Sequence, residues 1–206
     1  MTAAITFLGM FALIIGSIVA HEIAHGYVAS WLGDDTARVN GRLSLNPLKH
    51  LDPIGSFLVP ILLLLSGTGI FFGWAKPVPI DPSNFADPRV DRVKVGLAGP
   101  ATNAILALIA AGLFHLAAPI NAVVAQWLVN AVLINTTLAL FNLLPLPPLD
   151  GSSILGILLP ESVADAIDSI NPFITFLLLI ILINTGLVSA WLDHSVGAVS
   201  RILLGQ

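Results

Sequence analysis

Residues 2–32 read TAAITFLGMFALIIGSIVAHEIAHGYVASWL, an apolar stretch that carries two histidines and a glutamate in its second half. About 20 mainly apolar residues are enough for a helix to cross the hydrocarbon core of a bilayer. Ionisable side chains within such a stretch are costly in lipid unless they have partners, so they indicate a functional site. The stretch therefore predicts a membrane-spanning helix that carries chemistry.

The composition of the whole chain also favours a membrane protein. Of the 206 residues, 56% are hydrophobic and 10% are charged, against about 45–50% and about 25% in soluble globular chains. The formal net charge is −4 and there is no basic tract, so nucleic-acid binding is not expected. Cysteine is absent, which excludes disulfides, thiolate metal ligands and cysteine nucleophiles.

Three further stretches are long and apolar enough to cross a bilayer, namely residues 93–118, 122–144 and 172–192. A fifth, residues 54–72, is of marginal length and is interrupted by proline and glycine. We therefore expect an α-helical polytopic membrane protein with about four to six transmembrane or re-entrant segments. The length fits a single membrane-embedded domain over residues 1–206.

The polar segment after the first span predicts a short β-hairpin. In residues 36–45, Asn40-Gly41 separates two short runs that alternate apolar and polar side chains, which is the usual hairpin signal. An edge strand of this hairpin could pair with an extended polypeptide. The hairpin could equally do no more than close the loop.

The motif His21-Glu22-Ile23-Ala24-His25 lies within the first span. Residues four apart share one helix face, so both imidazoles project together, one turn apart. Two neutral imidazoles at this spacing suit a zinc ion. Glu22 lies about 100° around the helix from His21, badly placed as a third ligand but suited to act as a general base. The chain has only two glutamates and one falls here, which favours catalysis over buried structural histidines.

Catalytic zinc needs a third protein ligand, and Asp150 is the leading candidate. It follows the span at residues 122–144 directly, after a proline-rich turn. By residue type alone it could either bind the metal or cap the next helix. The competing histidines are His50 in a loop, His115 alone in an apolar span, and His194 in a terminal polar cluster.

The chain resembles the site-2 protease family of intramembrane zinc metalloproteases, in its minimal prokaryotic form without PDZ or CBS domains. The shared motifs occur in family order and are HEIAHG at 21–26, GRLSLNP at 41–47 followed by His50 and DPIG at 52–55, FGWAKPVP at 72–79, AGPATN at 98–103, and NLLPLPPLDG at 142–151. The resemblance implies that His21, His25 and Asp150 bind one zinc ion and that Glu22 activates water. Ser152 stands where the family commonly has a second glycine.

The resemblance further implies hydrolysis of peptide bonds in or near transmembrane segments of membrane-protein substrates, as in regulated intramembrane proteolysis. Asn103 and Asn142 could orient ligands or substrate, or could simply bond one helix to another within the bilayer. The alternative function is a metal-ion transporter that uses the intramembrane His and Asp residues as transport ligands. The sequence predicts neither a particular substrate nor an oligomeric state.

The basic residues predict the orientation in the cell membrane. Seven of the eight lie in two loops, with Arg38, Arg42 and Lys49 in one and Lys76, Arg89, Arg92 and Lys94 in or near the other. If Asp150 meets His25, the first span and the span at residues 122–144 must end near the same face of the membrane. Both polar loops then lie at that face, so residues 54–72 between them must be re-entrant, or the apolar chain that follows must cross back. The positive-inside rule places this common face, and the site nearest to it, on the cytoplasmic side.

Overall fold

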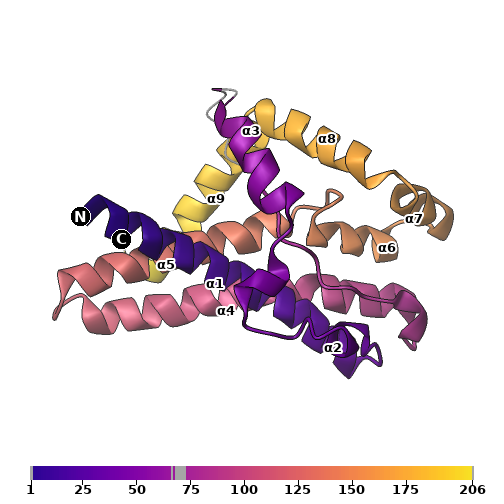
Figure 1. The fold of residues 1–206 in the computed structure, drawn as a ribbon, viewed down its shortest axis with the longest axis horizontal. Coiled ribbons are helices and arrows are strands. Elements are labelled where there is room, and N and C mark those ends of the chain that lie inside the picture. Colours follow the sequence, from indigo (N-terminus) through magenta and orange to yellow (C-terminus); the bar gives the residue numbers. More distant parts are fainter. Residues whose placement is uncertain (1, 66, 68–72, 206) are drawn as a thin grey trace.

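The computed structural model describes residues 2–65, 67 and 73–205, and the described chain is helical (Figure 1). The long helices are α1 (Thr2–Trp31), α4 (Pro88–Ala117), α5 (Ala122–Asn142) and α9 (Leu187–Leu204). Helix α4 packs against α1 and α5, and α5 also packs against α9. The shorter elements are α2 (Thr36–Val39), η1 (Pro47–His50), η2 (Ile54–Leu58), α3 (Val59–Leu65), η3 (Pro82–Asn84), η4 (Asp150–Ile154), α6 (Leu155–Leu158), α7 (Glu161–Asp168) and α8 (Pro172–Asn184).

Local capping explains where several helices begin. The side chains of Asp87, Asn121 and Asn171 accept hydrogen bonds from backbone N–H groups in the first turns of α4, α5 and α8, respectively. Such caps satisfy donors that have no partner within the helix. Pro88 opens α4, at a position where its missing N–H is not needed. These signals start α4 before residue 93, where the apolar stretch was expected to begin.

Three helices are long and apolar enough to cross a membrane, namely Ala4–Trp31, Pro88–Ala117 and Ala122–Asn142. Helices α8 and α9 pass the same test only as a pair, bent by 71°. The apolar stretch predicted at residues 172–192 is therefore divided between two helices, α8 and the first part of α9. Gly186 has a φ of +78°, a left-handed conformation that glycine adopts without strain, and it separates the two helices. The chain is thus an α-helical membrane protein.

The segment at residues 54–72 does not form a long helix among its described residues. Its last helix, α3, has 7 residues, whereas a span needs about 20; residues 66 and 68–72 lie outside the described residues. The N–H of Trp74 donates to the carbonyl of Gly55 (3.2 Å), and the hydroxyl of Ser56 donates to the carbonyl of Trp74 (3.0 Å). The chain has therefore returned to its starting point, as a re-entrant segment requires.

The prediction of a β-hairpin at residues 36–45 is wrong. Thr36–Val39 form α2, and no strand occurs anywhere in the described chain. Gly41 has a φ of +62°. Its N–H donates to the Arg38 carbonyl, and the N–H of Arg42 donates to the Ala37 carbonyl, both at 2.9 Å. These two bonds form a Schellman motif, so the positive φ that the Asn-Gly pair supplies ends a helix here and does not form a hairpin turn.

Asp34 holds the α2 region against a distant loop. Its side chain is fully buried and accepts a hydrogen bond from the N–H of Thr36 (3.0 Å). It also accepts from the N–H of Asp81 (2.7 Å) and from the side-chain amide of Asn84 (2.9 Å). Asp34 therefore joins the start of α2 to the segment that leads into α4.

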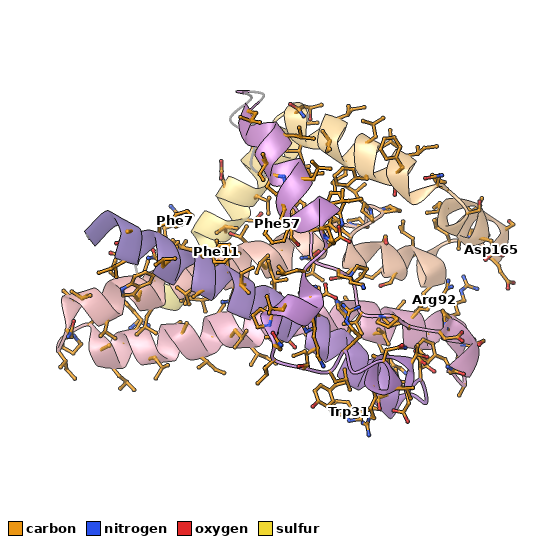
Figure 2. The ribbon with its side chains drawn as sticks, in the orientation of Figure 1. Phe7, Phe11, Trp31, Phe57, Arg92 and Asp165 are labelled. Carbon is orange, nitrogen blue, oxygen red and sulfur yellow. The ribbon has the colours of Figure 1, made fainter. Side chains whose placement is uncertain are left out.

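The surface reflects the two environments that the chain meets. Phe7, Phe11 and Phe57 are large apolar side chains with exposed fractions of 70%, 54% and 52%, as expected of side chains that face lipid. Figure 2 shows Phe7 and Phe11 toward one end of the molecule and Trp31 and Arg92 at the other. Because tryptophan favours the membrane–water boundary, the end of α1 at Trp31 marks the polar end of the molecule.

Candidate metal centre

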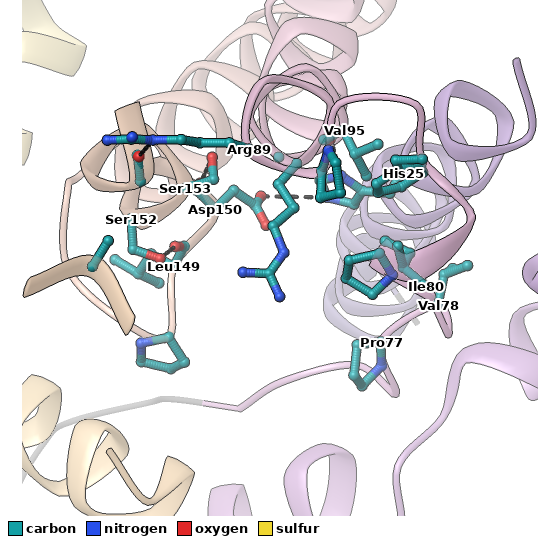
Figure 3. Close-up of a pocket in the computed structure, with 18 of the residues that line it drawn as sticks. His25, Pro77, Val78, Ile80, Arg89, Val95, Leu149, Asp150, Ser152 and Ser153 are labelled. Atoms are coloured by element: carbon teal, nitrogen blue, oxygen red, sulfur yellow. Dashed lines mark hydrogen bonds and ion pairs between the residues drawn. The ribbon is translucent and has the colours of Figure 1, made fainter. Parts of the chain in front are cut away.

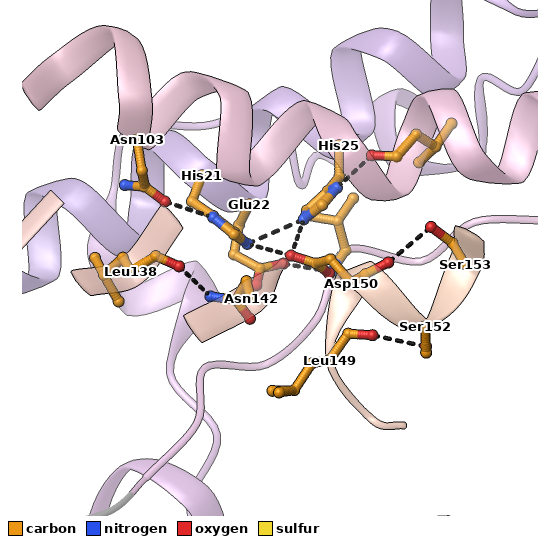
Figure 4. Close-up of polar contacts among 12 residues, drawn as sticks. His21, Glu22, His25, Asn103, Leu138, Asn142, Leu149, Asp150, Ser152 and Ser153 are labelled. Atoms are coloured by element: carbon orange, nitrogen blue, oxygen red, sulfur yellow. Dashed lines mark hydrogen bonds and ion pairs between the residues drawn. The ribbon is translucent and has the colours of Figure 1, made fainter. Parts of the chain in front are cut away.

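Two histidines of α1 and one aspartate of η4 meet inside the molecule (Figure 4). His21 and His25 are buried, and their Nε2 atoms lie 3.1 Å apart. Oδ2 of Asp150 lies 2.9 Å from Nε2 of His21 and 3.4 Å from Nε2 of His25. These residues form the one group of three or more His or acidic side chains in the described chain that could hold a metal ion.

Close backbone packing holds the segment of Asp150 against α4 and against the residues that follow α5. A Cβ on Gly96 of α4 would lie 3.0 Å from the carbonyl oxygen of Asp150, and a Cβ on Gly151 would lie 2.3 Å from the carbonyl oxygen of Leu143. Both glycines therefore permit contacts that a larger residue would block. The hydroxyl of Ser152 donates to the carbonyl of Leu149 (2.7 Å), so the serine that replaces a family glycine fits this turn.

Hydrogen bonds set the tautomers of both histidines. Nδ1 of His25 lies 2.7 Å from the Val95 carbonyl oxygen, which can only accept, so Nδ1 carries the proton. Nδ1 of His21 lies 2.6 Å from Oδ1 of Asn103. The amide nitrogen of Asn103 faces two other acceptors, which fixes the amide orientation. Both Nε2 atoms therefore carry lone pairs that point at Asp150.

The donor set fits a zinc ion. Three lone-pair atoms converge within 2.9–3.4 Å of one another, and the buried Oδ2 of Asp150 has no hydrogen-bond partner. Such an arrangement is repulsive unless a cation occupies its centre. Tetrahedral zinc with bonds of about 2.0–2.2 Å separates its ligands by roughly 3.3–3.6 Å. The ligand types suit this metal, and the three atoms would need to move apart by only a few tenths of an ångström to hold it.

Glu22 lies beside the cluster and is held by a backbone contact. Its Oε2 accepts a hydrogen bond from the N–H of Val78 (3.0 Å). Val78 belongs to an extended segment, residues 73–81, which is itself anchored where the N–H of Lys76 donates to the His50 carbonyl (2.8 Å). The carboxylate is thus oriented next to the candidate ligands without facing them as a fourth one.

The competing histidines lie away from the cluster. His50 is buried, and its Nε2 donates to the Ser44 carbonyl (2.8 Å), so it braces the loops around residues 44–50. Nε2 of His115 donates to the Leu203 carbonyl (2.9 Å) and so links α4 to α9. His194 is exposed on α9.

The two candidate asparagines differ in their contacts. Asn103 is fully buried and touches His21. The side-chain amide of Asn142 donates to the Leu138 carbonyl of its own helix (3.0 Å), and Asn142 also lines a cavity beside the cluster.

Reasoning from single residues missed the role of Gly99, where a Cβ would lie 2.5 Å from Nε2 of both His21 and His25. Its signal was its place in the motif at residues 98–103.

Two cavities of different character meet at the cluster, and Glu22 and Asp150 line both. The larger, about 800 Å³, has mixed walls, in which apolar side chains alternate with charged ones; Figure 3 shows Arg89 among the latter. The other charged residues of its lining include Arg92, Glu161 and Asp165. The smaller, about 530 Å³, lies between α1, α5 and α8 and has apolar walls, among them Ile18, Leu138, Phe141, Phe173, Phe176 and Leu179. At its edge the ring of Trp74 packs edge-on against Phe176, with centroids 4.6 Å apart. The site thus opens toward one cavity that contains charged side chains and another that is almost entirely apolar.

Proteins of similar sequence are named as putative zinc metalloproteases. The chain is 44% identical over 179 residues to "Putative zinc metalloprotease YwhC" of Bacillus subtilis, which covers 82% of this chain and 78% of that protein. It is 30% identical over 192 residues to "Putative zinc metalloprotease Rip2" of Mycolicibacterium smegmatis, covering 91% of this chain and 72% of that protein. A protein of the same name from Mycobacterium tuberculosis is 31% identical over 153 residues, 71% of this chain and 57% of that protein.

No protein-family model matches the chain, and no solved structure matches it either. The similarity to the named relatives covers most of the chain. The cluster of His21, His25 and Asp150, which could hold a metal ion, suits the zinc that these names specify. The chain therefore belongs to this family of zinc metalloproteases, the site-2 protease type whose motifs its sequence resembles.

Proposed function

We propose that the protein is an intramembrane zinc endopeptidase, which hydrolyses peptide bonds in or near transmembrane segments of membrane proteins and so serves regulated intramembrane proteolysis. The observation that carries this proposal is the position of the cluster. His21, His25 and Glu22 lie on a helix that is long and apolar enough to span a membrane, at the junction of an apolar and a polar cavity.

The two cavities support a path for a membrane-embedded substrate. A transmembrane segment would enter from the bilayer through the apolar cavity, while the charged cavity admits the water that hydrolysis needs. A helical substrate must unwind before it is cut, because its backbone groups are bonded to one another. Segments with glycine or proline near the cut unwind at the lowest cost.

The chain supplies the groups for metal-assisted hydrolysis. His21, His25 and Asp150 would hold zinc, which when bound lowers the pKa of water and polarises a carbonyl. Glu22 accepts the proton of the attacking water and passes it to the leaving amine. Asn142 lines the apolar cavity beside Glu22, where its amide can donate to the oxygen of the scissile carbonyl.

The depth of the site supports cleavage near one face. His21 lies ten residues before Trp31, the last residue of α1, which corresponds to about 15 Å along a helix. Seven of the eight basic residues lie in the two segments that follow α1 and precede α4 or in the first two turns of α4. By the positive-inside rule the face next to them is the cytoplasmic face of the cell membrane.

A metal-ion transporter is less well supported. A transport path needs polar ligands at several depths in the membrane, whereas the described residues contain a single group of ligands that could hold a metal, His21, His25 and Asp150. The general base beside this group also has no role in transport. The peptidase function is therefore the one that the site favours.

The proposal is tested by reconstituting the purified protein in liposomes with a model single-span substrate and mapping the products by mass spectrometry. We expect a single internal cut within the transmembrane segment or next to it, and no cleavage of an unfolded soluble protein added outside. Removal of residues one at a time from a terminus, or cleavage of only the soluble protein, would contradict an intramembrane endopeptidase.

A further inference from the structure

We propose that Asn135 and Asn103 are positioning residues, which hold His21 in the tautomer and orientation that a zinc ligand needs through one directional hydrogen-bond chain across three helices. The inference rests on the proposed function only in so far as His21 is a zinc ligand. It does not depend on which peptide is cut or where in the membrane the cut occurs.

The chain of bonds runs from α1 through α4 to α5. Nδ1 of His21 donates to Oδ1 of Asn103 (2.6 Å). Nδ2 of Asn103 then donates to Oδ1 of Asn135 (2.9 Å). Nδ2 of Asn135 donates in turn to the backbone carbonyl of Ala131, one turn earlier on α5 (3.0 Å). The second hydrogen of the Asn103 amide faces the carbonyl of Ser17 on α1 (3.3 Å).

Backbone carbonyls set the direction of this chain. The carbonyls of Ala131 and Ser17 can only accept hydrogen bonds, so the nitrogen of each amide must face them. That leaves Oδ1 of Asn135 for Asn103 and Oδ1 of Asn103 for His21. An amide oxygen beside the imidazole requires a proton on Nδ1 of His21, and the lone pair of the ring is then on Nε2, which faces Asp150.

The burial of these groups makes the chain costly unless every member is bonded. Asn103 and Asn135 have exposed fractions of 0% and 4%, within helices that would span the membrane. An unpaired amide at such a position is destabilising, because it loses its hydrogen bonds to water and gains none within the protein. Asn135 also lines neither of the two cavities at the cluster. Its place in the site is therefore explained by its bond to Asn103 and not by contact with substrate.

The first test measures the dissociation constant for zinc in detergent by competition with a chelator. Partners of metal-binding histidines typically contribute about 10–100-fold in metal affinity. We expect Asn103→Leu to weaken zinc binding within this range and Asn135→Leu to weaken it by roughly 10-fold. Asn135→Asp keeps an acceptor for Asn103 but loses the donor to the Ala131 carbonyl, so we expect it to weaken zinc binding less than Asn135→Leu does.

Thr136→Val is the matched control. Thr136 is the next residue on α5, is also buried, and has a hydroxyl with no hydrogen-bond partner. We expect its zinc affinity to be unchanged. Equal weakening of zinc binding by Asn135→Leu and Thr136→Val would overturn the proposal, because both effects would then come from lost packing. Unchanged zinc binding in Asn135→Leu would overturn it too, because Asn135 would then have no influence on the metal site.

The second test reads the tautomer directly by ¹⁵N NMR of the metal-free protein. We expect His21 to be protonated at Nδ1 in the unchanged protein and in Asn103→Asp, which keeps the acceptor, but to show a mixture of tautomers in Asn103→Leu, which removes it. A pure Nδ1–H form in Asn103→Leu would overturn the proposal. Neither measurement needs a substrate, so failure to cleave transmembrane segments would reject the proposed function and leave this inference standing.

Discussion

Gly99 of α4 lies directly against His21 of α1, so closely that a Cβ at residue 99 would be 2.5 Å from Nε2 of the imidazole. The same Cβ would be 2.5 Å from Nε2 of His25. Real Cβ atoms do not approach other heavy atoms this closely. The absence of a side chain at this position therefore makes room for the two rings at the place where their lone pairs converge.

Gly99→Ala should consequently displace one or both imidazoles and weaken zinc binding by at least about 10-fold. Gly112→Ala on the same helix is the matched control, because a Cβ at that position meets nothing within 4 Å. In a helix, alanine is favoured over glycine by up to about 1 kcal/mol, so the control should fold at least as well as the unchanged protein. Zinc content measured by mass spectrometry tests both variants, and full occupancy in Gly99→Ala would contradict this account of the packing.

The third ligand can be assigned by comparing aspartate and histidine variants. Asp150→Ala should lose zinc and peptidase activity together, because it removes an atom that lies 2.9 Å from Nε2 of His21. His115→Ala should retain zinc, since the ring of His115 bonds to the Leu203 carbonyl and is not part of the metal cluster. His50→Ala should lower stability and yet retain zinc. Loss of zinc in His50→Ala with retention in Asp150→Ala would show that the ligands are wrongly assigned.

Much of the fold follows from the sequence because membrane solvation leaves few options. Apolar stretches of sufficient length must be helical in lipid, which is why α1, α4 and α5 were predicted close to their observed bounds. The bend at Gly186 and the helix at Thr36–Val39 were not predicted. A positive φ at glycine suits a hairpin turn, a helix end or a bend equally well, and only the tertiary partners of the flanking residues decide among them.

The candidate site, like the fold, could be predicted only in part from the sequence. The spacing of His21 and His25 was readable because a helix repeats every 3.6 residues. By residue type alone, Asp150 could be either a metal ligand or the cap of the next helix, because no local sequence signal fixes its distance from α1. Gly99, Val95 and Asn135 were not readable as parts of the site, since their roles depend on how closely α4 approaches its neighbours.

Asp34 should make the stability of the α2 region depend on pH. Burial raises the pKa of its carboxyl, but hydrogen bonds from Thr36, Asp81 and Asn84 together lower the pKa by more than burial raises it. The pKa therefore lies below its usual value. A folded-state pKa below the unfolded one, about 3.9, gives stability that is present above this pH and is lost as pH falls through the folded value.

We therefore expect Asp34→Ala to lower the stability near neutral pH by about 1–2 kcal/mol, seen as a lower thermal midpoint, and the difference to shrink below about pH 4. Asp35→Ala is the control, because its side chain is 58% exposed in a pair with Arg38 and such pairs contribute little. A difference from the unchanged protein that stays constant down to pH 2 would contradict this role of the carboxylate.

The topology can be tested by cysteine labelling, since the chain has no cysteine. Cysteines at Ser44 and Ser83 should both react from the cytoplasmic side, because the loops that hold them are bonded together where Arg42 donates to the Lys76 carbonyl (2.8 Å). Ala118→Cys lies at the far end of α4 and should react from the opposite side. Labelling of Ser44→Cys and Ser83→Cys from opposite sides would exclude a re-entrant segment between them.

Under the proposed function, Glu22 is the general base of a zinc peptidase and is not itself a metal ligand. Glu22→Gln keeps the size of the side chain and the three candidate ligands but removes the proton acceptor. The decisive measurement is therefore zinc content and cleavage of a transmembrane substrate on the same Glu22→Gln preparation. We expect zinc at the level of the unchanged protein and a loss of at least about 100-fold in cleavage rate. Cleavage near the original rate, or loss of zinc from the variant, would contradict this role of Glu22.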